Sequence, residues 1–235
     1  MHQHNSAVRD AILRKLRRAQ PAQPLPLPDL RPYQAGPWGQ GVAESASGLS
    51  LMDSFERAAS GWRAQVHRTS TRQWAETLRN VLQRHRCHRI AMGPVVFGLP
   101  GMDDALRGRH AITLERPVDE WRGLLFDEVD ASITLATAGI ADTGTLVILP
   151  GRHEPRALSL VPPIHIALLR ASTLHASLAK AIQALRPQEQ LPTNFLLVTG
   201  PSKTADIQQT LAYGAHGPKD LVILLIDDFT QHFAG

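Results

Sequence analysis

The sequence predicts an α/β fold, a Rossmann-like three-layer arrangement in which helices cover both faces of a mostly parallel sheet. Two observations support this prediction. Short β-favouring runs alternate along the chain with segments of helical spacing, a pattern typical of βαβ units. The last such run, residues 221–226, is apolar nearly throughout, as expected of a parallel strand that is covered on both sides. A chain of 235 residues is long enough to bury the core of one such domain.

The N-terminal region differs in composition from the rest of the chain. Residues 5–19 predict an amphipathic helix, whose apolar residues share one side: Val8, Ile12, Leu13 and Leu16. Residues 20–41 are rich in Pro and Gly, so they predict a linker and not a regular element. We therefore expect residues 1–47 to form a separable helix and linker, and residues 48–235 to form the α/β domain.

Helical spacing of apolar residues recurs four times within the expected domain, over residues 51–66, 71–84, 119–126 and 176–185. The first two segments carry the expected core contacts, which are Phe55, Trp62, Trp74, Leu78 and Leu82. Pro187 follows the last segment and accounts for its end.

Short apolar runs predict the strands, over residues 89–92, 95–99, 131–138, 144–149 and 164–169. A turn over residues 139–144 predicts a local pairing of the two strands beside it. The chain then offers a short, buried strand at 195–198, a turn at Gly200 and a helix that begins at the N-cap Ser202. The strand at 221–226 completes a strand–helix–strand unit.

The net charge and the lengths of the apolar runs indicate which partners and which cellular location to expect. The formal charge of +4 is too small to demand a nucleic-acid partner. No apolar run approaches the ~20 residues of a membrane span, and no hydrophobic signal region follows the first methionine. We therefore expect a cytoplasmic protein without a membrane span.

The single cysteine, Cys87, excludes an internal disulfide. It also excludes an iron–sulfur cluster held by this chain alone, because such clusters need about four thiolates. We expect Cys87 to be a structural, partly buried thiol. His85 and His88 lie close to Cys87, but their spacing does not form a tetrahedral ligand set, so we expect no metal site.

A polar turn between two strands is the first candidate site. Asp142, Thr143, Gly144 and Thr145 form it. Asp often caps a turn and Gly supplies positive φ, so an ordinary turn explains these residues equally well.

Two histidines are candidates for hydrogen bonding or proton transfer. His165 alternates with apolar neighbours in the expected strand 164–169. A core histidine with a satisfied hydrogen bond is the alternative. His216 lies between two glycines, and their turn and helix-end roles explain the glycines but not the histidine.

The third candidate is the turn that contains Gly200, Ser202, Lys203 and Thr204. Its spacing is not that of a phosphate-binding P-loop. A helix beginning at Ser202 with Lys203 beside it would suit a smaller anion, such as a carboxylate or a single phosphate.

Three blocks of the sequence together resemble the lactate utilisation protein C family, of the LUD domain type. They read GIADTGTLVI, SLVPPIHIALL and TGPSKTADIQQTLAYGAHGPKDLVILLI, over residues 139–148, 159–169 and 199–226. The resemblance implies a NagB/RpiA/CoA transferase-like fold and a role in oxidising L-lactate to pyruvate beside two cysteine-rich iron–sulfur partner subunits. This chain would be the subunit without a cluster. The same blocks favour functional roles for the residues of the three candidate sites.

The chain departs from the family pattern at three positions. Asp142 stands where many relatives carry Glu, Lys203 where Arg is commoner, and Ala215 where Val is commoner. The change at Lys203 keeps the charge but loses bidentate carboxylate binding.

Three functional hypotheses follow. The leading one is a subunit of a lactate-oxidising complex that binds an organic acid or another small anion. The second is a free-standing enzyme of transferase or isomerase type that acts on an acyl-CoA or a sugar phosphate, although fold analogy alone is a weak reason for it. The third is a scaffold or regulatory subunit. Whether the chain is itself an enzyme, and whether it forms a homo-oligomer, stays open.

Overall fold

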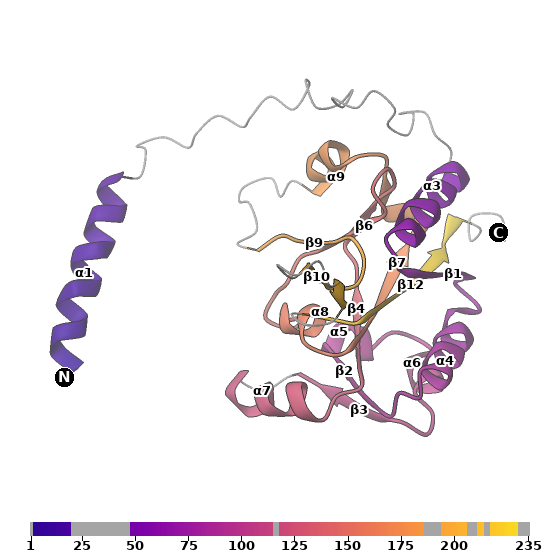
Figure 1. The fold of residues 1–235 in the computed structure, drawn as a ribbon, viewed down its shortest axis with the longest axis horizontal. Coiled ribbons are helices and arrows are strands. Elements are labelled where there is room, and N and C mark those ends of the chain that lie inside the picture. The colour runs from indigo at the N-terminus through magenta and orange to yellow at the C-terminus, as the bar shows by residue number, and fades with distance from the viewer. Residues whose placement is uncertain are drawn as a thin grey trace. The chain divides into compact units, whose positions relative to one another are not determined.

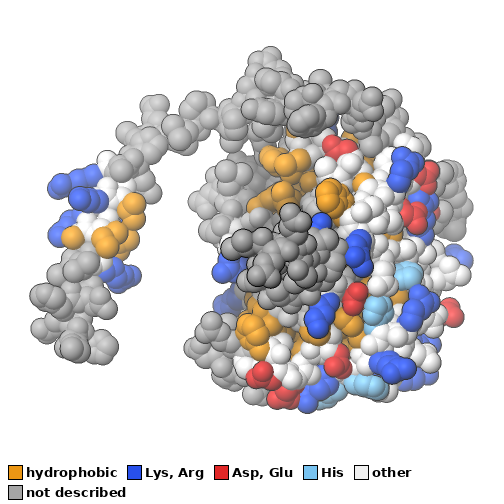
Figure 2. Space-filling view, viewed as in Figure 1, with side chains coloured by type: hydrophobic (Ala, Val, Ile, Leu, Met, Phe, Trp, Pro, Cys, Tyr) orange, Lys and Arg blue, Asp and Glu red, His pale blue; other side chains and the backbone are white. Residues whose placement is uncertain are grey.

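The computed structural model describes residues 2–19, 48–114, 118–185, 194–205, 211–213 and 217–229 (Figure 1). The chain divides into two compact units, residues 1–33 and 34–235. In the first unit, α1 (His2–Ala19) confirms the predicted helix, and Figure 2 shows hydrophobic side chains on one side of it. Ile12 and Leu16 of this helix are exposed. The predicted domain boundary after residue 47 lies outside the described residues.

The second unit is built around a parallel sheet, in which the described residues form six strands in the order β1-β12-β7-β4-β2-β3. Every pair of neighbours is parallel. Their bounds are β1 (Gln65–Ser70), β12 (Asp220–Asp227), β7 (Ile164–Arg170), β4 (Ala131–Leu135), β2 (Arg89–Met92) and β3 (His110–Thr113). The interior residues of β7 and β12 are buried throughout, because both faces of the sheet are covered. The prediction of a mostly parallel sheet is confirmed.

Alternate residues of β7 pack into different cores, and this defines the layers. Ile166 and Leu168 pack with α4 (Trp74–Arg84), α5 (Pro94–Phe97) and α6 (Met102–Ala105). Ala167 and Leu169 pack with α3 (Gly48–Gly61) on the other face. The helices α7 (Val118–Asp127) and α8 (Ala157–Leu160) pack against Ala91 of β2 in a further core. The expected three-layer arrangement is therefore present.

A second, smaller sheet carries the first candidate turn. Among the described residues its order is β8-β5-β6-β9, with β8 (Leu174–His175), β5 (Ala138–Ile140), β6 (Thr145–Ile148) and β9 (Leu196–Val198). The antiparallel pairing of β5 with β6 confirms the predicted local pairing. The strand predicted at 195–198 is also present, but its expected burial is wrong, since Leu197 is 42% exposed. It lies antiparallel to β6 and not in the parallel sheet.

The helix predicted to begin at Ser202 is wrong. Lys203–Ala205 forms strand β10, which pairs antiparallel with β11 (Leu211–Tyr213). The hairpin partner takes up the backbone hydrogen bonds that a helix would have used internally, so tertiary pairing overrides the local N-cap signal. The remaining elements formed by the described residues of the second unit are η1 (Ala171–Thr173) and α9 (Leu178–Leu185). Helix α9 confirms the helix predicted at 176–185.

Two further predictions differ from the structure. The helix predicted over 51–66 ends at Gly61, and Arg63 adopts a φ of 68° that no helix continues through. Strand β1 follows and supplies an edge of the parallel sheet. The strand predicted at 95–99 is instead the short helix α5, in which Pro94 occupies a first-turn position that suits its fixed φ. Of the expected core residues, Trp62 is 57% exposed.

Cys87 is a free and buried thiol. Burial raises the pKa of this thiol to about 11, so it is protonated at neutral pH and is a poor nucleophile. The prediction of a structural thiol agrees with this environment. Across the described parts of the chain, no helix is both long and apolar enough to cross a bilayer, and no cluster of three metal-ligating side chains occurs.

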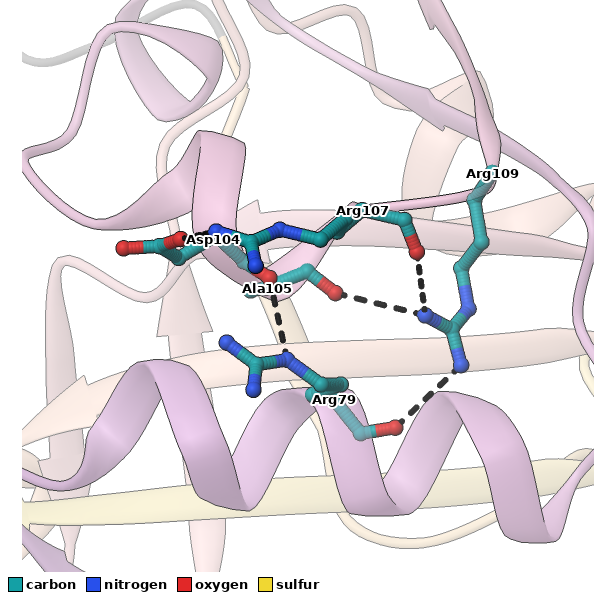
Figure 3. A network of polar contacts seen from close by, with 5 residues as sticks. All are labelled: Arg79, Asp104, Ala105, Arg107 and Arg109. Atoms are coloured by element: carbon teal, nitrogen blue, oxygen red, sulfur yellow. Dashed lines mark hydrogen bonds and ion pairs between the residues drawn. The ribbon is translucent and has the colours of Figure 1, made fainter.

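Arg109 joins several elements of the α4 face through backbone carbonyls (Figure 3). Its guanidinium donates to the carbonyl oxygens of Arg79, Ala105 and Arg107, at 3.3, 3.5 and 3.3 Å, and its Nε donates to that of Cys87 at 3.2 Å. The acceptors lie in α4, at the end of α6 and just before β2. A planar, five-donor group suits this divergent set of acceptors better than an ammonium does.

We predict that Arg109→Lys lowers the free energy of unfolding by about 1–3 kcal/mol, because lysine cannot reach the same carbonyls together. Urea unfolding followed by circular dichroism measures it. Arg107→Lys is the matched control, since the Arg107 side chain is 77% exposed and its ion pair is with the exposed Asp104. This change should alter stability by less than about 0.5 kcal/mol. Equal effects of the two substitutions would contradict the role given to Arg109.

Candidate functional site

The turn between β5 and β6 packs directly on the backbone of α3. Gly144 has a φ of 65°, and a Cβ atom at this position would lie 2.1 Å from the backbone nitrogen of Ala59. Both facts require glycine here. The turn is therefore held by a backbone-to-backbone approach that any side chain would prevent.

The turn after β9 makes a similar approach a few residues further along. Gly200 has a φ of 117°, and a Cβ atom there would lie 2.5 Å from the carbonyl oxygen of Trp62. Both glycine turns thus pack against the same place, the last turn of α3 and the residue after it. The structure brings together the first and third candidate sites, which are more than 50 residues apart in the sequence.

Hydroxyl groups connect the two turns. The Thr145 Oγ1 atom lies 2.8 Å from the Oγ1 of Thr143 and 2.8 Å from the Oγ1 of Thr199. Thr145 is buried and the other two are exposed. The predicted polar turn is therefore linked to the end of β9 by a chain of side-chain hydrogen bonds.

A cavity of about 230 Å³ lies beside Thr199, at the amino-terminal ends of β7 and β12. Its polar lining residues are Ser159, His165, Thr199 and Ser202, and its apolar walls include Leu160, Leu196, Val198, Pro218 and Leu221. An apolar pocket with a few convergent polar groups is the usual form of a small-molecule site. No Asp, Glu, Lys or Arg occurs among the described residues that line it.

Ser202 is held against the segment that leads into β12. Its backbone N–H donates to the carbonyl oxygen of Pro218 at 2.8 Å. A Cβ atom on Gly217 would come within 3.0 Å of the Ser202 Cβ. The amide of Ser202 is therefore already satisfied by the protein. The proposed anion site at a helix N-terminus is corrected accordingly, because no helix begins here and this amide is not available.

His165 is a buried polar residue of the cavity, with none of its surface exposed. Its Nε2 lies 2.8 Å from the Oγ1 of Thr134, which is also fully buried. Its Nδ1 has no hydrogen-bond partner within the part of the chain that the structure describes. Burial lowers the pKa of the imidazole to about 4, so His165 is neutral at pH 7.

The remaining predicted site residues lie elsewhere. Asp142 is exposed at the β5–β6 turn; partial burial of its carboxyl raises the pKa, while hydrogen bonds from Thr143 act in the opposite direction. Lys203 is exposed on β10, next to the cavity residue Ser202, and Thr204 follows it in the same strand. His216 lies outside the described residues.

Three polar residues of the site were not among the site residues predicted from the sequence: Thr134, Ser159 and Thr199. Ser132 and Thr134 are polar at alternate positions of an otherwise apolar strand, which places both on one face. Such a pair on a strand expected to be buried was the available signal for a partner to His165. Thr199 gave no comparable signal, because its role depends on the contact between two sheets.

The family of the chain follows from comparison with known proteins. Residues 52–226 match the LUD domain. The chain belongs to the LUD domain family. This confirms the resemblance inferred from the three sequence blocks. A crystal structure of a DUF162 family protein from Deinococcus radiodurans superposes on the LUD domain of this chain with a TM-score of 0.57, at 21% identity, covering 77% of this chain and 99% of that one. It supports the fold.

Relatives of the LUD domain differ in how much of the chain they match. The "Uncharacterized protein NMB1437" of Neisseria meningitidis serogroup B is 50% identical over 116 residues, which span 49% of this chain and 50% of that protein. Lactate utilization protein C of Macrococcus caseolyticus is 29% identical over 68% of this chain and 71% of its own length. The protein of the same name from Halalkalibacterium halodurans is 25% identical over 80% and 84%.

A second titratable group, Glu154, lies at the opposite end of the sheet's strands from His165. Glu154 Oε1 accepts a hydrogen bond from the backbone N–H of Leu135, at the carboxyl end of β4, at 3.2 Å. Burial raises the pKa of Glu154 to about 7. The loop around Glu154 also contacts the end of β2, since a Cβ atom on Gly93 would lie 2.2 Å from the carbonyl oxygen of His153. The strands β2 and β4 continue to opposite sides of the sheet, and this switch point is where parallel sheets commonly bind ligands.

We predict that Gly144→Ala lowers the free energy of unfolding by about 2–4 kcal/mol, because alanine is strained at this φ and its Cβ overlaps the α3 backbone. Gly123→Ala is the control, since Gly123 is exposed in α7 with nothing within 4 Å of its Cβ position. That change should stabilise by about 0.5–1 kcal/mol. Chemical unfolding of both variants measures the difference. A Gly144→Ala protein as stable as wild type would refute the close approach.

We predict that Glu154→Gln stabilises the protein above pH 7 and has little effect near pH 4.5. The pKa of Glu154 is raised from 4.5 to about 7 in the folded state, so the native protein retains a proton that the unfolded chain has lost. Stability therefore falls as pH rises through this window. Glutamine keeps the acceptor for Leu135 and does not ionise, so it should gain about 1–3 kcal/mol at pH 8. Urea unfolding at several pH values tests this, and a pH-independent difference would contradict it.

Proposed function

We propose that this chain takes part in lactate utilisation and that its cavity binds a small organic acid. The observation behind this proposal is that two of the family's three sequence blocks line one cavity, through His165, Thr199 and Ser202. Relatives named Lactate utilization protein C support the physiological part of the proposal. The site, and not the fold, supports the ligand part.

The chemistry of the cavity suits a small molecule with an apolar body and an oxygen atom. Hydroxyl groups from Ser159, Thr199 and Ser202 can donate or accept hydrogen bonds. The volume of about 230 Å³ is smaller than that of typical drug-sized pockets, about 300–1,000 Å³. A carboxylate would lie toward solvent, near the exposed Lys203, because a buried charge without a partner costs several kcal/mol.

We further propose that iron–sulfur partner subunits carry the redox chemistry. The chain has one cysteine, and Cys87 is buried with a raised pKa. A cluster would need about four thiolates. In this proposal the chain binds or positions the organic acid while its partners move the electrons.

One observation favours a second candidate function, that of a free-standing transferase or isomerase. Glu154 combines a pKa near 7 with a position at the switch point of the parallel sheet. A carboxyl group with a pKa near the working pH can act as a general acid or base. Turnover of an acyl-CoA or a sugar phosphate by the isolated chain, lost in Glu154→Gln, would favour this candidate.

We predict that a host strain deleted for this gene grows poorly on L-lactate and normally on glucose. Complementation with Thr199→Val should restore growth on lactate at no more than about half the wild-type rate, since the variant keeps the side-chain shape but loses a cavity hydroxyl and its hydrogen bond. Thr173→Val is the control, because among the described residues its hydroxyl donates to the Arg170 carbonyl alone, outside the cavity. Growth rates and immunoblots give the readout.

The same strains test the partners. A tagged copy purified anaerobically from lactate-grown cells should retain iron and lactate-oxidising activity. Unimpaired growth of the deletion strain on lactate would refute the physiological role. A lone, iron-free protein beside a clear growth defect would refute the partner proposal only.

A further inference from the structure

Both nitrogens of His165 need partners inside the protein, because its side chain has no exposed surface. On the neighbouring strand, Ser132 stands in register with His165. The Ser132 hydroxyl donates to the carbonyl oxygen of Leu158 and is thus engaged elsewhere. Thr134 therefore remains as the partner of Nε2, at 2.8 Å.

The direction of this hydrogen bond decides the tautomer. If Nε2 carried the proton, it would donate to Thr134, and the threonine O–H would then need an acceptor. The described residues offer it none besides His165. In that arrangement both the Thr134 O–H and the lone pair of Nδ1 would be unsatisfied. If Thr134 donates to Nε2, only one group is left over, the N–H of Nδ1. The Nδ1–H arrangement leaves one buried group without a hydrogen bond instead of two, which favours it by about 1–3 kcal/mol.

We infer that Thr134 holds His165 as the neutral Nδ1–H tautomer, and that this unpaired N–H of a cavity-lining residue donates a hydrogen bond to an uncharged oxygen of a ligand that enters the cavity. Thr134 is a positioning residue, since it acts through the imidazole. His165 then cannot accept a proton at Nδ1 from a bound hydroxy acid. Its role is recognition of an oxygen atom.

The surroundings narrow the ligand class. The imidazole is neutral, and the described lining offers no cationic side chain to a buried carboxylate. The oxygen that reaches Nδ1 therefore belongs to a hydroxyl or carbonyl group, and the ligand is a small hydroxy or oxo acid with its carboxylate toward solvent. This statement of the ligand rests on the proposed function, whereas the tautomer rests on the protein alone.

Nitrogen NMR of the full-length chain tests the tautomer without any ligand. Long-range proton–nitrogen correlation spectra of 15N-labelled protein at pH 7 report which ring nitrogen carries hydrogen, and His165→Asn assigns the signals. Wild type and Thr134→Ser should show a protonated Nδ1 and an unprotonated Nε2. Thr134→Val removes the donor and should shift the population toward Nε2–H. A wild-type His165 that is protonated at Nε2, or at both nitrogens, would overturn the inference.

Titration of the same sample tests the ligand class with L-lactate, pyruvate and propionate. Propionate is the matched control, because it lacks only the hydroxyl or carbonyl oxygen. Its affinity should be at least about tenfold lower, since it leaves the Nδ1–H unpaired. Equal affinities would overturn the recognition role of His165. No binding of any of the three, with the Nδ1–H tautomer present, would refute the organic-acid ligand of the proposed function and leave the tautomer supported.

Discussion

The candidate site depends on two places where one backbone approaches another with no side chain between them. Gly144 and Gly200 each lie against the end of α3, close to Ala59 and to Trp62. Since α3 also packs on the parallel sheet, it fixes the positions of both turns relative to that sheet. Their threonine hydroxyls can then meet at 2.8 Å. A substitution at either glycine would therefore alter the cavity wall without touching a polar residue.

The parts of the fold that the sequence predicted are those in which local pattern and burial agree. The continuous apolar run of β12 is one example, because its place in the interior of the sheet demands apolar residues on both faces. Strand β1 was missed because it is an edge strand of mixed polarity, whose parallel partner lies more than 150 residues away. The pair β10–β11 was misread for a related reason, since antiparallel pairing outweighed a local helix signal.

The sequence indicated which residues to consider for the candidate site, but not how they are arranged. Residues of the blocks around His165 and Gly200 line one cavity, and the block around Gly144 is joined to it through the hydrogen bond between Thr145 and Thr199. The functional roles of these blocks stay a prediction. The anion site built on a helix N-terminus failed because it required a local structure that long-range pairing replaced. Thr134 could not be joined to His165 from the sequence, because a hydrogen bond across neighbouring strands depends on their order in the sheet.

His165 and Glu154 are too far apart to act as one acid–base pair. His165 is in register with Ser132, near the amino-terminal end of β7, whereas Glu154 bonds to Leu135, three residues further along β4. At about 3.3 Å per residue, this separates them by roughly 10 Å along the strand. A reaction that needed both groups would require a ligand that reaches from the amino-terminal ends of the strands to their carboxyl ends. A ligand small enough for the cavity at His165 therefore does not reach Glu154, and any proton transfer by Glu154 would belong to a separate site at the carboxyl ends of the strands.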